Sequence, residues 1–143
     1  MLNEIEEDFI NKFIVKNKRE RLKFELNNSK KRKDGIGRFC HNANKLVCNN
    51  KIYESGDLSE NILLSLIKEY GKDSKSYVIA FNEELDKKFM THQEVIEKVI
   101  GNGMAAVIIN HDIAIIETEQ YGGNADKIVL IDKNWKWGIK GEK

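Results

Sequence analysis

Two apolar segments in the second half of the chain dominate the pattern of hydrophobic and polar positions. Residues 104–109 and 113–116 are apolar throughout, and the polar triplet Asn110-His111-Asp112 separates them. Two segments rich in β-branched residues on either side of a short polar corner predict a β-hairpin. A third apolar segment, 128–131, follows the turn signal Gly122-Gly123. Since these strands lack polar alternation, we expect other elements to cover both faces of their sheet.

Helical spacing of apolar residues prevails nearer the N-terminus. Residues 2–15 predict an amphipathic helix, and residues 16–26 are rich in good helix formers. A further helical stripe covers residues 36–47. Gly35 and Gly37 stand at its beginning, where we expect them to weaken or interrupt a helix.

Residues 58–70 have the clearest helical pattern in the chain. We expect Asp57 or Ser59 to cap this helix and Gly71 to end it. The short apolar segment 77–81 then predicts a buried strand.

Helical spacing returns over residues 83–100, with an expected joint near Thr91, which can cap a second helix through Glu94. Residues 51–54 predict a short extended piece. Taken together, the elements predict one α+β domain over residues 1–143. N-terminal helices would pack on a C-terminal, mainly antiparallel sheet whose elements follow the order β-α-β-β-β.

Composition narrows the class of protein. The chain is 41% hydrophobic and 33% charged, which indicates a folded, soluble protein. It has neither an apolar run long enough to cross a membrane nor a basic, then apolar, signal-peptide pattern at its start. We therefore expect a cytoplasmic protein in which Cys40 and Cys48 stay reduced. The absence of proline, with abundant lysine, asparagine and isoleucine, is typical of AT-rich bacterial genomes.

Positive charge is concentrated in one segment although the whole chain has a net charge of only +1. Residues 16–45 hold eleven Lys or Arg and three Asp or Glu, a net charge of +8. Such a cluster can bind nucleic acid or an acidic protein, and it can equally be a solvated face with local ion pairs. The candidate contact residues are Lys18, Arg19, Arg21, Lys30, Lys31, Arg32, Lys33, Arg38 and Lys45.

Candidate catalytic residues are few. His41 can act as a general acid or base, and helical spacing puts it on one face with Arg38 and Lys45. The alternative is a polar helix face with a surface histidine. Glu117 and Glu119 alternate along a strand, so they can serve a metal ion or a general base, or act as charges that protect a sheet edge.

Other motifs carry little chemistry. His111 and Asp112 suit a tight turn. The sequence lacks the common glycine-rich nucleotide loops, the HExxH and GxSxG motifs and a CxxC pair. We expect no metal or cofactor. Trp135 and Trp137 would project from one side of an extended tail, packing on their own domain or on a second copy in a homodimer.

The leading hypothesis is a non-enzymatic binding protein whose basic helical surface contacts nucleic acid or an acidic protein partner. One alternative is a nuclease-like or phosphate-ester enzyme using His41 with Arg38 and Lys45. Another is an inhibitor or immunity-type protein that binds its partner through the acidic C-terminal half, since residues 46–143 hold sixteen acidic and twelve basic side chains.

Overall fold

One antiparallel sheet of six strands organises residues 3–101, 104–118 and 126–132, the part of the chain that the computed structural model describes. The strands follow the spatial order β1-β6-β5-β4-β2-β3. Their bounds are Ile52–Gly56 for β1, Lys75–Ala80 for β2, Lys88–Thr91 for β3, Ala106–Asn110 for β4, Ile113–Glu117 for β5 and Lys127–Ile131 for β6.

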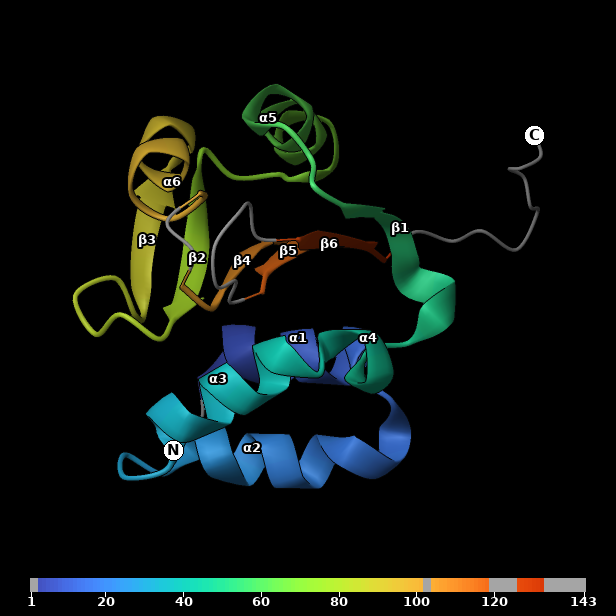
Figure 1. The fold of residues 1–143 in the computed structure, drawn as a ribbon, viewed down its shortest axis with the longest axis vertical. Coiled ribbons are helices and arrows are strands. Elements are labelled where there is room, and N and C mark those ends of the chain that lie inside the picture. The colour runs from blue at the N-terminus through green and yellow to red at the C-terminus, as the bar shows by residue number, and fades with distance from the viewer. Residues whose placement is uncertain (1–2, 102–103, 119–125, 133–143) are drawn as a thin grey trace.

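Helices cover both faces of this sheet (Figure 1). On one side lie α1 (Glu4–Phe13), α2 (Arg19–Asn27), α3 (Arg32–His41) and the short α4 (Ala43–Leu46). On the other side lie α5 (Glu60–Tyr70) and α6 (His92–Lys98). Short 3-10 turns precede α2 (η1, Lys16–Lys18) and β1 (η2, Asn49–Lys51). Helix α2 is the layer farthest from the sheet, outside α1 and α3 (Figure 1).

Alternation along the central strands divides the core into two clusters. In β4, Val107 and Ile109 pack with α1–α4, whereas Ala106 and Ile108 pack with α5 and α6. Each of these side chains is at most 6% exposed. The predicted α+β class, the β4–β5 hairpin and the cover on both sheet faces are therefore confirmed. His111 has a φ of 58° at the hairpin corner, as turn chemistry requires.

The predicted helix over residues 83–100 is wrong in its first part. Residues Lys88–Thr91 form the edge strand β3, which pairs with β2, and only His92–Lys98 is helical. Thr91 caps α6, and its side chain and that of Glu94 form a reciprocal capping box, as predicted. An N-cap residue is extended, so Thr91 can be the last residue of β3 and also the cap at which α6 begins.

The second edge strand is β1, which pairs with β6. It includes residues 52–54 of the predicted extended segment 51–54, and residue 51 belongs to η2. The observed sheet thus adds an edge strand on each side to the four strands of the predicted β-α-β-β-β order. Ser59, and not Asp57, caps α5 by accepting a hydrogen bond from the Ile62 amide.

A buried ion cluster joins the N-terminal helices to the sheet. Arg32 donates to both carboxylate oxygens of Glu6, at 2.8 and 2.6 Å, and to both of Asp86, at 2.7 and 3.0 Å. Its remaining donor bonds the Leu26 carbonyl at 2.9 Å. All five guanidinium N–H groups are therefore satisfied. The Tyr77 hydroxyl, from β2, adds a hydrogen bond to Glu6 at 2.7 Å.

Burial and hydrogen bonding together set the charge states of Arg32 and Tyr77. Burial disfavours the charged guanidinium, but the hydrogen bonds to Glu6 and Asp86 outweigh that effect and raise the pKa of Arg32. Burial and the hydrogen bond to Glu6 also raise the pKa of Tyr77, so its hydroxyl stays a donor. The cluster links α1, the end of α2, the beginning of α3 and the β2–β3 connection.

Replacing Arg32 with methionine should destabilise the fold strongly. Arg32→Met leaves the carboxylates of Glu6 and Asp86 without their cation, which typically costs about 3–5 kcal/mol. Lys31→Met is the matched control, because Lys31 is an exposed neighbour and its loss should change stability by less than about 0.5 kcal/mol. Urea denaturation measures both, and equal midpoints for the two variants would contradict the assigned role of Arg32.

Candidate binding groove

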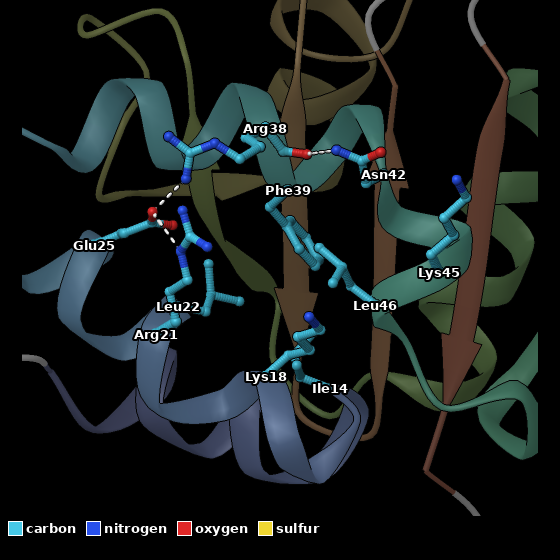
Figure 2. A pocket seen from close by; sticks show the side chains of 10 residues that line it. All are labelled: Ile14, Lys18, Arg21, Leu22, Glu25, Arg38, Phe39, Asn42, Lys45 and Leu46. Carbon is cyan, nitrogen blue, oxygen red and sulfur yellow. Dashed lines mark hydrogen bonds and ion pairs between the residues drawn. The ribbon is translucent and has the colours of Figure 1, made fainter.

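A groove of about 340 Å³ lies between α2 and the α3–α4 segment (Figure 2). Four cationic side chains line it, and four apolar side chains form its floor. The cations are Lys18, Arg21, Arg38 and Lys45. The apolar residues are Ile14, Leu22, Phe39 and Leu46. Glu25 and Asn42 complete the lining. We call this site the basic groove.

Side chains on one face of α2 and of the turn before it form one wall of the basic groove. Lys18, Arg21, Leu22 and Glu25 recur at intervals of three and four residues, which puts them on one face of α2 and its preceding turn. Leu22 is buried in the core, so this wall is anchored to the domain.

The opposite wall depends on the end of α3. The Asn42 side chain donates to the Arg38 carbonyl at 3.0 Å, and the backbone of Asn42 leaves the helical region there. The chain then turns into α4, which brings Lys45 and Leu46 to the groove. Phe39 is only 4% exposed and joins the floor to the core.

Glu25 holds two arginines in place. Its carboxylate accepts a hydrogen bond from Nε of Arg21 at 3.3 Å and a hydrogen bond from Nη1 of Arg38 (Figure 2). The Glu25 side chain is 11% exposed, against 72% for Arg21 and 47% for Arg38. Each guanidinium group therefore contacts the buried carboxylate of Glu25, while the rest of each arginine side chain is exposed to solvent. With four cations and one carboxylate, the lining carries a net charge of +3.

Gly35 determines how closely α2 and α3 approach. A Cβ atom at this position would lie 2.9 Å from Cβ of Glu25, closer than real side chains tolerate. Helix α3 runs through Gly35 and Gly37, so the expected interruption at these glycines is wrong. The physical reason is packing. Gly35 permits the close contact with α2, and the contacts between the two helices outweigh the low helix propensity of glycine.

The predicted contact residues separate into several groups. Lys18, Arg21, Arg38 and Lys45 come together in the basic groove. Arg32, by contrast, is buried in the ion cluster and contributes no contact surface. A variant that neutralises the whole 30–33 run would therefore test stability as much as binding.

The remaining predicted contact residues lie outside the groove lining. Lys30 and Lys31 are exposed in the turn between α2 and α3. Arg19 donates from Nε to the Ile14 carbonyl at 2.8 Å. Lys33 lies 3.6 Å from the Glu83 carboxylate and 4.7 Å from the centre of the Phe81 ring.

His41 lies three residues after Arg38 in α3, but His41 lines a different cavity from Arg38 and Lys45. That cavity has a volume of about 410 Å³ and is lined also by Asn44, Ser55 and Lys127. Arg38 and Lys45 line the basic groove instead. The predicted helical spacing holds between Arg38 and His41, but α3 ends at His41, so the spacing does not extend to Lys45 in α4.

Glu117 is buried at the end of β5. Its two carboxylate oxygens accept the Gly101 amide at 3.0 and 3.1 Å, and its register partner in β6 is Lys127. Glu117 thus ties the connection after α6 to the sheet. Glu119, Trp135 and Trp137 lie outside the described residues.

Other features of the described residues bear on function. Cys40 and Cys48 are not joined in a disulfide bond. No three His, Cys, Asp or Glu side chains in residues 3–101, 104–118 and 126–132 gather where they could hold a metal ion. Over the same residues, no helix is long and apolar enough to cross a membrane.

Comparison with protein families, curated proteins and solved structures found no match to this chain. Function must therefore be argued from the site. Sequence reasoning missed Glu25 and the apolar floor as parts of that site. The spacing of Arg21 and Glu25, four residues apart on a helix, was the local signal for their pairing.

Adding a methyl group to each glycine of α3 should have opposite effects. Gly35→Ala should lower the free energy of unfolding by about 1–3 kcal/mol, because the new Cβ overpacks the contact with Glu25. Gly37→Ala should raise it by about 0.5–1 kcal/mol, since its Cβ would meet Phe81 at an ordinary 3.6 Å and alanine favours a helix. Urea denaturation measures both, and changes of the same sign would contradict this account of the helix contact.

Proposed function

We propose that this protein is a non-enzymatic binding protein that holds an anionic partner, nucleic acid or an acidic protein, in the basic groove. The observation that carries the proposal is the convergence of Lys18, Arg21, Arg38 and Lys45 on one groove with a net charge of +3. Such a concentration of charge attracts anions and speeds their association.

The lining of the groove favours binding over catalysis. Cleavage of a phosphate ester needs a nucleophile or a general base close to the cations. Among the residues that line the basic groove, Glu25 is the one carboxylate, and two arginines hold it. His41 faces another cavity. These placements give the enzymatic alternative less support than the binding function.

Five acidic side chains of the second half of the chain already have partners within the fold. Asp86 and Glu117 make buried structural contacts. Asp73, Asp112 and Asp132 each lie against a cationic or histidine side chain. An inhibitor that binds through this half therefore has less support than a protein that binds through the groove.

Two substitutions that each remove one unit of charge, positive in one case and negative in the other, should change anion binding in opposite directions. Arg38→Gln should weaken binding of a fluorescein-labelled polyglutamate or single-stranded oligonucleotide about tenfold, equivalent to ~1.4 kcal/mol. Glu25→Gln should strengthen binding several-fold, because it removes the negative charge from the groove and preserves the side-chain shape. Fluorescence anisotropy at low and high salt measures both effects, and added salt should weaken binding through screening.

The control for this experiment is Lys68→Gln. Lys68 is exposed on α5, on the other side of the sheet, so its neutralisation changes net charge without touching the groove. Equal effects of Arg38→Gln and Lys68→Gln would reject the groove as the binding surface. Absence of binding to either anion at low salt would reject the proposed function itself.

A further inference from the structure

The accessible part of the basic groove is its set of cations. The apolar side chains beneath them are closed off, since Ile14 is 0%, Leu22 6% and Phe39 4% exposed. A protein partner usually gains affinity by burying apolar and aromatic side chains at the centre of its interface. These three side chains cannot provide such a centre, so a partner of the groove must bind mainly through its charges.

The cations follow the length of the groove. In Figure 2, Arg21 and Arg38 lie at one end, Lys18 beside the middle and Lys45 at the other end. Each of these four residues is exposed. A partner that complements this order carries negative charge at repeated positions along its own length, as the phosphates of a nucleic acid strand do.

The two arginines are held in a form that suits a phosphate. Glu25 accepts one hydrogen bond from each guanidinium, which leaves further N–H donors on both. A guanidinium can bind two phosphate oxygens at once through parallel N–H groups. A phosphate can therefore bind on the solvent side of Arg21 and Arg38 while Glu25 keeps both side chains in place.

An open aromatic ring adjoins the α2 wall of the groove. Phe24 is 57% exposed and follows Arg21 by three residues in α2. At about 100° per residue, the two side chains are about 60° apart around the helix, so Phe24 lies next to Arg21 on the outer surface of α2. Bases of single strands stack on exposed aromatic rings, whereas the bases of a duplex are already paired and stacked. The ring and the arginine together favour a single strand.

We infer that the partner is a single-stranded nucleic acid, bound through its phosphates in the basic groove and through a base stacked on Phe24. The inference rests on the proposed function and narrows its partner to one class of polymer. Phosphate contacts and stacking carry little base-specific information, so binding should depend weakly on base sequence. Each phosphate contact to a single strand contributes about −0.7 to the slope of log affinity against log salt, so four cations predict a slope of about −3.

The experiment compares four fluorescein-labelled probes of matched length by fluorescence anisotropy with the full chain. The probes are single-stranded oligothymidylate, the same oligomer without its bases, a duplex of oligothymidylate with oligoadenylate, and polyglutamate. Oligothymidylate should bind at least about fivefold more tightly than each of the other three, because it alone combines phosphates with unpaired bases.

A pair of matched substitutions tests the stacked base. Phe24→Leu removes the ring and keeps an apolar side chain. It should weaken oligothymidylate about tenfold and leave the base-free oligomer unchanged. The control is Phe89→Leu, because Phe89 is 56% exposed on the edge strand β3, outside the groove lining, and its loss should leave every affinity unchanged.

A third substitution tests the path of the phosphates. Lys18→Gln removes the cation beside the middle of the groove. It should weaken oligothymidylate and the base-free oligomer alike and make the salt slope about 0.7 shallower. Far-ultraviolet circular dichroism establishes that each variant is folded, so that lost binding is not lost structure.

The outcomes separate this inference from the proposed function. Equal or tighter binding of the base-free oligomer, the duplex or polyglutamate, lost in Arg38→Gln, overturns the inference and supports the general anion site. Equal effects of Phe24→Leu and Phe89→Leu, or unchanged oligothymidylate binding in Lys18→Gln, also overturn it. Absence of binding by all four probes at low salt overturns the inference and the proposed function together.

Discussion

The buried hydrogen bonds of Arg32 are the interaction on which the N-terminal half of this fold depends. One guanidinium reaches Glu6 in α1, the end of α2 and Asp86 after β2. Removing three charges from water is costly, so a buried ion cluster adds little net stability compared with apolar packing. The cluster instead fixes where α3 begins, because all five N–H donors of Arg32 are bonded in this one arrangement.

The basic groove is a consequence of that placement. Helix α3 begins at Arg32, contacts Glu25 of α2 at Gly35, and then presents Arg38 and Phe39 opposite Arg21 and Leu22. Two arginines six residues apart in the same helix thus have opposite roles. Arg32 points inward and is neutralised, whereas Arg38 points towards solvent with its charge only partly offset by Glu25. The fold produces a surface with fixed cations because the helices beneath it are fixed.

Sequence reasoning succeeded where structure is decided locally. The β4–β5 hairpin, the cover on both sheet faces and the cap at Thr91 follow from residues close in the chain. It failed over Lys88–Thr91, whose extended form depends on pairing with β2. Arg32 and Lys33 look alike within a basic run, and the burial of Arg32 depends on acids 26 and 54 residues away. Four groove cations were predicted as contact residues, but their apolar floor requires the packing of two helices, which residue spacing does not give.

Mapping the surface that an anionic polymer contacts tests the central claim most directly. Backbone amide chemical shifts of the full chain, recorded by nuclear magnetic resonance during titration with polyglutamate, report which elements the polymer contacts. The account predicts that the largest changes fall in α2, the second half of α3 and α4, around Arg21, Arg38 and Lys45. Changes concentrated in α5, α6 or β1, with those helices unaffected, would contradict it.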